Sequence, residues 1–286
     1  MALYDCFVFH NEFDILEIRL REMADLVDHF VLVEANQTQR GTDKPYHFAE
    51  NRGRFKAWAD KIIDVQITFP DQLPKAHGKY HRRGGWEREN YQRNCISQGL
   101  ETAAPGDLVM VSDVDEIVRR SALQNVLETH AYRGKLVVFE QSLHKLKLDR
   151  VVPDKSWLLG SRMVEKKHLT TPQKLRRTRA KLRQRAYVPA GLTALILRAQ
   201  NLISTGIGLP VEIVADGGWH FSSMGGLERF QKKLESVVHG RSVDYNDIEA
   251  LYRREMAAYA PFPISDLPDC IAEGLFPDLL EDGRAK

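Results

Sequence analysis

The sequence predicts an α/β fold with a largely parallel sheet, helices on both faces of the sheet and a helical C-terminal part. The first reason is that short apolar runs alternate with helical patterns over residues 1–143. Such alternation is typical of βαβ units, whose crossover helices cover a parallel sheet. The second reason is size, because the chain has 286 residues, of which 43% are hydrophobic and 28% charged. These values suit one large domain with a substantial core.

Apolar runs bounded by turn residues are the expected strands of the first half, at residues 3–9, 30–33, 62–68, 108–112 and 135–143. A helix is expected after the first run, with Asn11 as its N-cap and Leu16, Leu20, Met23 and Val27 at helical spacing. Further helices are expected at residues 49–58, 86–100 and 121–131, and a long polar loop at residues 71–85.

The second half is less regular. Strands are expected at residues 157–164 and 211–215, and helices at residues 172–186, 191–204, 227–239 and 245–259. Residues 261–286 hold four of the twelve prolines. Because proline cannot continue a helix or a central strand, we expect this end of the chain to be mostly loop.

Composition limits the class of protein. No apolar stretch approaches the roughly 18 residues that suggest a membrane span. The chain begins without a basic n-region and runs directly into an expected strand, so we expect no signal peptide and a cytoplasmic location. The cysteines Cys6, Cys95 and Cys270 cannot all pair and lack zinc-site spacing, so we expect buried thiols.

Basic residues are concentrated in one segment, although the net charge is only +2. Residues 144–185 contain 14 Lys and Arg against 3 Asp and Glu, and residues 174–185 contain seven basic residues and no acid. Such a segment could meet nucleic acid, anionic lipid or a phosphorylated substrate, or could be a solvated helix face. It lacks interleaved aromatic residues and any nucleic-acid motif, so no nucleic-acid partner is expected.

The tetrapeptide Asp113-Val114-Asp115-Glu116 follows directly after the apolar run at residues 108–112. Side chains alternate across a strand, so an extended backbone would point Asp113 and Asp115 to the same side. Two such carboxylates repel each other unless a cation or a proton relieves them, and hard oxygen ligands suit Mg2+ or Mn2+. Open α/β sheets bind ligands at the carboxyl ends of their strands, which favours a metal over a solvated acidic turn.

Other polar residues of the first half could line a cleft. His10 and Asn11 occupy the first strand-to-helix turn, where a helix N-terminus can face phosphate. Glu34 follows the second strand, where an acid commonly receives a ribose hydroxyl, although a loop acid or helix cap is the alternative. On the helix expected at residues 86–100, the Arg88 guanidinium offers two parallel N–H donors to a phosphate. Asn94 offers an amide edge to a base such as uracil. An exposed helix with Glu–Arg pairs remains the other interpretation.

The segment Asp216-Gly217-Gly218-Trp219-His220-Phe221 is the second site candidate. Paired glycines let another group approach the backbone closely. Trp219 can stack on a sugar ring, and the imidazole of His220 can ligate a metal, although a lone His is more often structural. Asp216 stands where a general base could deprotonate a hydroxyl.

Together these segments resemble glycosyltransferase family 17, typified by the beta-1,4-mannosyl-glycoprotein 4-beta-N-acetylglucosaminyltransferases. The similarity is carried in chain order by Val31-Leu32-Val33-Glu34, Arg88-Glu89-Asn90, Ser112-Asp113-Val114-Asp115-Glu116 and Gly218-Trp219-His220-Phe221. The resemblance implies a GT-A-like (Rossmann-like) nucleotide-sugar-binding sheet, a UDP-sugar donor such as UDP-GlcNAc, a divalent metal (Mn2+ or Mg2+) and inversion at the anomeric carbon.

The resemblance also implies roles for particular residues. Asp113 and Asp115 match the metal-binding acids of the family, and His220 is similar in placement to a metal-ligating His of GT-A enzymes. Asp113 is also expected to reach the donor through its ribose or a water. Glu34, Arg88 and Asn94 are similar in position to nucleotide-pocket residues, joined by His10, Asn11 and Trp219 as donor-binding candidates. Inversion needs a base opposite the UDP, for which Asp216 is the first candidate and Glu140 the second.

We therefore expect a single GT-A-like domain over residues 1–286. Within it, residues 1–143 form the nucleotide-sugar-binding half, residues 144–260 the acceptor side with a basic helical insert, and residues 261–286 a C-terminal tail. The expected acceptor is a glycan or a lipid-linked glycan. The basic segment would allow peripheral contact with an anionic membrane.

Two other classes of protein compete with this reading. A phosphatase with an Asp-x-Asp nucleophile pair would carry that pair after its first strand, whereas here it follows about the fourth. A non-enzymatic module would use the basic segment at residues 166–185 to bind a polyanion or a membrane, and its binding would fall steeply with salt.

Overall fold

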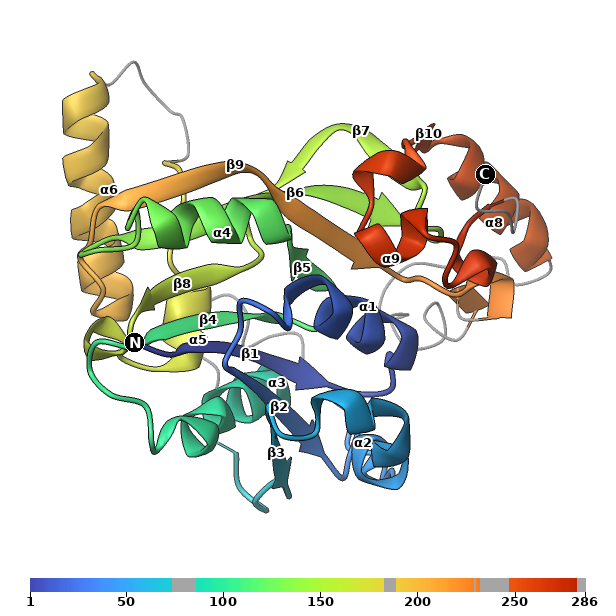
Figure 1. Ribbon diagram of the computed structural model, residues 1–286, viewed down its shortest axis with the longest axis horizontal. Coiled ribbons are helices and arrows are strands. Elements are labelled where there is room, and N and C mark those ends of the chain that lie inside the picture. The colour runs from blue at the N-terminus through green and yellow to red at the C-terminus, as the bar shows by residue number, and fades with distance from the viewer. Residues whose placement is uncertain (74–85, 183–188, 229, 232–246, 282–286) are drawn as a thin grey trace.

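The structure is a computed structural model that describes residues 1–73, 86–182, 189–228, 230–231 and 247–281. Within these residues, ten strands form one sheet (Figure 1). The strands are β1 (Leu3–Phe9), β2 (His29–Ala35), β3 (Ile62–Ile67), β4 (Leu108–Asp113), β5 (Glu116–Val118), β6 (Leu136–Lys145), β7 (Arg150–Trp157), β8 (Arg162–Glu165), β9 (Val211–Ser222) and β10 (Ala260–Pro261). The α-helices are α1 (Phe13–Met23), α2 (His47–Glu50), α3 (Trp86–Asn94), α4 (Arg120–Glu128), α5 (Pro172–Arg176), α6 (Ala190–Thr205), α8 (Ile248–Ala257) and α9 (Asp269–Ala272). Short 3-10 helices are η1 (Arg52–Trp58), η3 (Cys95–Leu100), η4 (Lys166–His168), η6 (Ile264–Asp266) and η7 (Pro277–Leu279).

The N-terminal half of the sheet is parallel, in the order β3-β2-β1-β4. From β1 the chain steps outward to β2 and β3, then returns to place β4 on the other side of β1. Such a reversal of strand order opens a crevice at the carboxyl ends of the two central strands, where ligands of open α/β sheets bind. The acidic tetrapeptide begins at the last residue of β4, and His10 follows β1. The fold therefore brings these two predicted segments to that crevice.

The rest of the sheet departs from the largely parallel prediction. β8 is antiparallel to β4 and to β6, and β7 is antiparallel to β6, whereas β9 is parallel to β6. Only residues 146–149 separate β6 from β7. A connection this short makes a hairpin, because a parallel partner needs a crossover of a dozen or more residues. The α/β class is confirmed, but the sheet is mixed.

Helices cover both faces of the sheet, as predicted. One core cluster joins α1 and α4 to the sheet, through residues such as Leu20 and Leu123. The other joins η3 and α5 to the opposite face, through Ile96 and Leu175. A third cluster packs the C-terminal residues, among them Ile271, against Trp219 and α1. The cysteines are buried and free, as expected.

Several element predictions were wrong in extent. The expected helix at residues 49–58 is divided between α2 and η1, and the one at 86–100 changes to 3-10 geometry after Asn94. The strand expected at 157–164 is two strands, β7 and β8, and β9 continues seven residues past 215 to Ser222. The C-terminal end holds α9, η6 and η7 rather than mostly loop. The helix expected at 172–186 was too long, because α5 ends at Arg176 and residues 177–182 are not helical. Residues 183–186 lie outside the described residues, as do most of the predicted loop at 71–85 and most of the predicted helix at 227–239. No helix in the described part of the chain has the length and apolar character to span a bilayer.

Burial of Glu22 on α1 leads to a pH-dependent prediction. The side chain accepts a 2.8 Å hydrogen bond from the backbone N–H of Arg120 at the start of α4, and burial raises its pKa from 4.5 to about 7. Folding raises the pKa of Glu22, so the protonated side chain contributes its full stability below the unfolded pKa. This contribution is lost as the pH rises through about 7. Glu22→Gln keeps an acceptor for Arg120 and should raise the free energy of unfolding at pH 8 by on the order of 1–3 kcal/mol.

Urea denaturation at pH 8 and at pH 4 measures this effect. The gain should vanish at pH 4, where the unfolded chain also begins to hold the proton. Glu101→Gln, at an exposed position, is the matched control and should change stability little at either pH. Equal stability of Glu22→Gln and the parent protein at pH 8 would disprove the prediction.

Candidate active site

The acidic tetrapeptide forms a tight connection between β4 and β5, held from below by Arg19 of α1. The guanidinium is fully buried and donates to the carbonyls of Asp113, Val114 and Glu116 at 3.0 to 3.3 Å. Its other edge forms a two-point ion pair with Asp5 on β1, at 2.5 and 2.7 Å. A planar fork of donors suits this task, because one side chain can satisfy several carbonyls and a carboxylate together.

Asp113 lies between two guanidiniums. Arg93 of α3 contacts Oδ1 at 2.7 Å, and Arg176 of α5 contacts Oδ2 at 3.1 Å. Burial alone would raise the pKa of Asp113, but the two cations outweigh it and hold the pKa well below its usual range. Asp113 is therefore a carboxylate that fixes two arginines at the end of β4. Both of its oxygens are already engaged, so Asp113 does not fit a direct metal-ligand role in this arrangement.

Glu116 is the fully buried acid of the tetrapeptide. Its Oε1 accepts from Arg176 at 2.6 Å and from the indole N–H of Trp157 at 2.8 Å. Its Oε2 accepts from the backbone N–H of Asp113 at 2.9 Å. Burial raises the pKa of Glu116, aided by the charges of Asp113 and Asp115 and opposed by Arg176. Glu116 thus closes the turn and links it to α5 and β7.

Asp115 faces His220 across the pairing of β5 with β9. Glu116 and His220 are partners in that antiparallel register, and Phe221 donates its backbone N–H to the carbonyl of Asp115 at 2.8 Å. The Asp115 Oδ2 and His220 Nε2 atoms lie 3.5 Å apart. Burial would lower the pKa of His220, but Asp115 raises it overall, with help from Glu116 and Asp113.

The donor set at this turn partly fits a divalent cation. Two ligands at right angles around an octahedral metal, each about 2.1 Å from it, are about 3 Å apart, which is close to the Asp115–His220 separation. No group of three or more His, Cys, Asp or Glu side chains arranged for a metal occurs among the described residues. Mg2+ and similar ions are often held by one or two protein groups together with substrate phosphates, so a pair of ligands is a workable site.

Glu34 is placed differently from what the sequence analysis expected. It is fully buried, and its carboxylate accepts from the backbone N–H groups of His47 and Phe48, both at 2.8 Å. Lys44 Nζ adds a 2.6 Å ion pair. The carboxylate thus caps α2, which matches the helix-cap alternative. Contact with a ribose would require it to leave these partners.

The first strand-to-helix turn carries His10 and Asn11. The Glu12 carboxylate accepts from the backbone N–H of both residues at 3.0 to 3.1 Å, and Glu12 rather than Asn11 is the N-cap of α1. The rings of His10 and His47 meet edge to face, with centroids 6.1 Å apart. Burial lowers the pKa of His10. A neutral imidazole at this crevice could accept or donate a hydrogen bond to a nucleotide.

Buried polar atoms without partners gather near α3. Among the described residues, Arg88 Nε, Asn90 Oδ1, Asn36 Oδ1 and Gln39 Oε1 are buried and make no hydrogen bond. Native proteins satisfy most such atoms, so a group of them indicates a place where a ligand or water supplies the partner. Asn94 does not belong to this group, because its Oδ1 accepts from the backbone N–H of Gln173 at 3.1 Å and ties α3 to α5.

A bulge in β9 exposes Asp216. Phe139 pairs with Val214 and Gln141 with Gly218, so Glu140 is opposed by three residues of β9. Asp216 takes φ 48° and Gly218 φ 137°, and a Cβ at Gly218 would stand 2.1 Å from the carbonyl oxygen of Ile117. Only glycine allows the strands to approach this closely.

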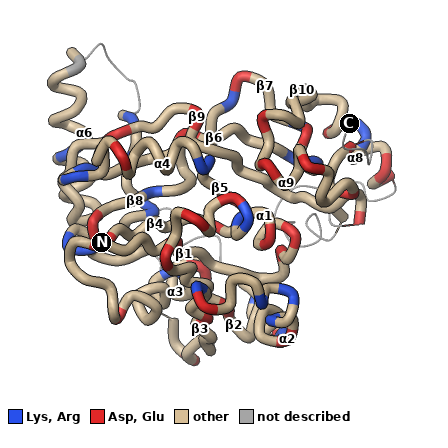
Figure 2. Tube along the Cα trace, viewed as in Figure 1, with Lys and Arg blue, Asp and Glu red and all other residues tan. Residues whose placement is uncertain are grey.

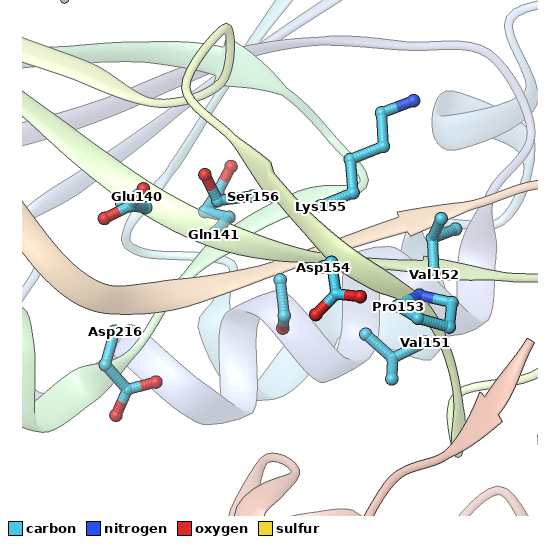
Figure 3. Close-up of a pocket in the computed structure, with 10 residues that line it drawn as sticks. Glu140, Gln141, Val151, Val152, Pro153, Asp154, Lys155, Ser156 and Asp216 are labelled. Carbon is cyan, nitrogen blue, oxygen red and sulfur yellow. The ribbon is translucent and has the colours of Figure 1, made fainter.

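Asp216 and Glu140, the two predicted bases, line the same pocket of about 450 Å³ (Figure 3). Asp154 and Lys155 of β7 border the same space. The Asp216 side chain is 78% exposed, with Oδ1 3.0 Å from Arg119, and the Glu140 side chain is 25% exposed, 3.8 Å from Lys181. The structure therefore brings both candidates together on strands β6 and β9, which also carry His220 and its neighbours.

Trp219 does not fit the predicted sugar-stacking role. Its side chain is 1% exposed, its indole N–H donates to the carbonyl of Asp266 at 3.0 Å, and its ring stacks with Phe221 and Arg119. Trp219 is one residue from His220 and so points to the other face of β9. The aromatic ring beside His220 is that of Trp157, with ring centroids 4.5 Å apart.

Arg93, Arg176 and Trp157 are functional candidates that sequence reasoning missed. Arg93 was visible in the polar stripe of the helix at 86–94, next to Asn94. Arg176 is one of seven basic residues in residues 174–185, and its neighbours there include Arg177 and Arg179. The sequence pattern held no signal that Arg176 in particular reaches Asp113, because α5 is a single short turn whose register only packing decides.

A family model described as glycosyltransferase family 17 matches residues 1–175. This match covers more than half of the chain and includes β1, α3 and the acidic tetrapeptide. The chain belongs to glycosyltransferase family 17. The resemblance seen in the sequence motifs is thereby confirmed. His220 and Asp216 lie outside the matched residues, so their assignment rests on the geometry described above.

Curated relatives are the beta-1,4-mannosyl-glycoprotein 4-beta-N-acetylglucosaminyltransferases of Homo sapiens and Rattus norvegicus. Each is 32% identical over 120 residues, which cover 40% of this chain and 21% of the relative. The similarity thus spans about a fifth of the length of these relatives.

Solved structures show weaker likeness. A 4-diphosphocytidyl-2C-methyl-D-erythritol synthase from Anaerococcus prevotii is 12% identical, with a TM-score of 0.40, over 75% of this chain and 86% of that one. A mannose-1-phosphate geranyltransferase from Thermus thermophilus is 14% identical, with a TM-score of 0.36, over 75% of this chain and 74% of the other. TM-scores this low carry no argument about the chain.

Proposed function

We propose that the chain transfers a sugar, GlcNAc, from a UDP-sugar to a glycan hydroxyl with inversion at the anomeric carbon. Membership of glycosyltransferase family 17 supports sugar transfer. The single observation that carries the proposal is the Asp115 carboxylate facing His220 Nε2 at 3.5 Å, at the carboxyl end of β4. This pair stands at the switch point of the sheet, where a nucleotide diphosphate is expected.

In this proposal Asp115 and His220 hold Mn2+ or Mg2+. The ion, when bound, would neutralise charge that develops on the leaving diphosphate. Arg93 and Arg176 stand beside it and offer further N–H donors for phosphate oxygens, while Asp113 fixes their orientation. The nucleotide would lie along α3, where the unpartnered buried atoms of Asn36 and Arg88 supply donors and acceptors.

The transfer step needs a base on the side of the acceptor. The acceptor hydroxyl oxygen bonds to the anomeric carbon, and the bond from that carbon to the UDP oxygen breaks, so UDP leaves with the electron pair. The hydroxyl proton passes to a carboxylate. Asp216 is our first candidate, because the bulge of β9 presents it at the mouth of the pocket. Glu140 is the second, since it lines the same pocket on β6.

Asp216→Asn should lower kcat by about 10²–10⁴-fold, with little change in the affinity for UDP. Glu140→Gln should lower kcat less. Initial-rate kinetics with UDP-GlcNAc and a panel of glycan acceptors would measure both. Full activity of Asp216→Asn together with a large loss in Glu140→Gln would move the base to Glu140.

The donor is tested by thermal shift with UDP-sugars, with and without Mn2+. Ligands that bind the native state raise its stability in proportion to RT ln(1 + [L]/Kd). UDP-GlcNAc with Mn2+ should give the largest rise in Tm, and UDP-glucose a smaller one. Equal shifts with and without the metal would count against a metal-assisted site.

A further inference from the structure

An apolar stripe runs along the outer side of α6. Among the described residues, the side of the helix that faces the body carries the buried residues Leu197, Asn201 and Thr205. At about 100° per residue these three share one face, and the opposite face carries Leu192, Leu195, Leu202 and Ile203. These four side chains are exposed by 49, 60, 56 and 86%. A surface helix normally turns polar residues outward, so α6 has the reverse of the expected pattern.

A basic segment lies beside α6, and acids are absent from the sequence around the helix. Residues 166–209 contain ten Lys and Arg and no Asp or Glu. Of these, Lys174, Arg177, Arg179 and Lys181 are exposed. Arg179 and Asn201 exchange backbone-to-side-chain hydrogen bonds at 2.8 and 3.0 Å, which fastens the basic segment alongside α6. Figure 1 shows α6 standing at one end of the molecule, and Figure 2 shows Lys and Arg positions beside it.

We propose that α6 and the exposed cations beside it dock the protein on an anionic lipid bilayer. Two forces hold peripheral helices at a membrane surface: burial of apolar side chains and attraction of cations to anionic lipids. The apolar stripe of α6 provides the first, and the cations beside the helix provide the second. Charge complementarity selects anionic lipid over a second copy of this chain, because two copies would bring the same cations together. The stripe enters the acyl boundary, and the cations contact lipid phosphates.

Docking would place the proposed active site close to the bilayer. α5 carries Lys174 on its exposed side, and Arg176 on the same helix points inward to Asp113 and Glu116. A bound membrane would therefore present a lipid-linked glycan near the site. This consequence rests on the proposed function, whereas the docking itself does not.

Flotation with vesicles tests the proposal. The full chain should float with vesicles of phosphatidylcholine containing about a third phosphatidylglycerol, and not with phosphatidylcholine alone. The double variant Leu195→Gln, Ile203→Gln should bind about a hundredfold more weakly, because each lost apolar contact should weaken binding about tenfold. Lys174→Gln, Arg177→Gln, Lys181→Gln should lose about fivefold per cation, and salt should weaken binding of the parent protein.

Matched controls lie elsewhere on the surface. Leu159→Gln removes a leucine that is 60% exposed, as Leu195 is, and Lys56→Gln, Arg253→Gln, Arg254→Gln removes three exposed cations. Both should float as the parent does, and circular dichroism should show all variants folded. Absence of flotation with anionic vesicles, or equal flotation of the α6 double variant and the Leu159 control, would overturn the proposal. A concentration-dependent dimer that Leu195→Gln, Ile203→Gln disperses, without flotation, would assign the stripe to a second copy and also overturn it.

Discussion

Asp115→Asn should abolish metal-dependent donor binding and lower kcat/KM by about 10³-fold or more, equivalent to about 4 kcal/mol of transition-state stabilisation. Asp115 offers its carboxylate toward His220 and, unlike Asp113, is not engaged by an arginine among the contacts of the described residues. An amide keeps the shape of the side chain but provides a neutral, weaker ligand. Calorimetric titration of UDP with and without Mn2+, together with initial rates, measures both effects.

His220→Ala provides an independent check on the same site. If Asp115 and His220 hold one ion, the double variant should lose little more activity than either single variant, because groups that act as a unit are not additive. Asp60 is exposed and lies just before the edge strand β3, away from the site. Asp60→Asn should therefore leave UDP binding and the initial rates unchanged. Mn2+-dependent binding of UDP to Asp115→Asn with the parent affinity would refute the metal assignment.

The sequence predicted the strand that delivers the acids, and the reason is local. Residues 108–111 are continuously apolar, and a strand buried on both faces requires that pattern. β1 and β2 are mostly apolar and were recognisable for the same reason, whereas the edge strand β3 was marked by its β-branched residues Ile62, Ile63, Val65 and Ile67. Parallel strands joined by helices leave few possible arrangements. The antiparallel strand β7 was missed because residues 150–157 are half-exposed or exposed, so no buried apolar run marks them. β8 lies buried between β6 and β4, but at four residues it is too short to stand out from its neighbours in sequence.

Individual roles within the site were harder to predict than its position. Sequence could place Glu34 at the end of a strand, but whether its carboxylate meets a ribose or caps α2 depends on how the loop after β2 folds back. Trp219 and Trp157 show the same limit. Which of two indoles stands beside His220 depends on the register of β9 against β5 and on the approach of β7, and both are long-range features.

Asp113 and Asp115 illustrate how packing separates two similar side chains. In the sequence both residues are acids near the end of a strand, but α3 and α5 bring arginines into contact with Asp113 alone of the two. Asp113 therefore has a pKa held below its usual range and acts on the arginines. Asp115 keeps its carboxylate for His220 and, in our proposal, for a metal.

Arg19→Met should destabilise the fold by about 3–5 kcal/mol, the largest stability change we expect in this chain. Methionine fills similar space, but it leaves the Asp5 carboxylate buried at 0% exposure without its partner. It also removes the donor for the carbonyls of Asp113, Val114 and Glu116. Urea denaturation measures the loss, and Arg21→Met on the same helix is the control. Arg21 forms an ion pair at the surface with Glu17, so its loss should cost less than about 1 kcal/mol.

A second change separates the buried charge from the lost carbonyl contacts. Asp5→Leu in the Arg19→Met background removes the unpaired carboxylate and should recover part of the stability, because a buried lone charge is the more costly defect. The recovery should be incomplete, since the three carbonyls still lack their donor. If the carbonyl contacts hold the acidic turn in place, the double variant should fold yet bind Mn2+ and UDP more weakly than the parent. A double variant with parent-like donor binding would show that Arg19 stabilises the core and has no part in shaping the site.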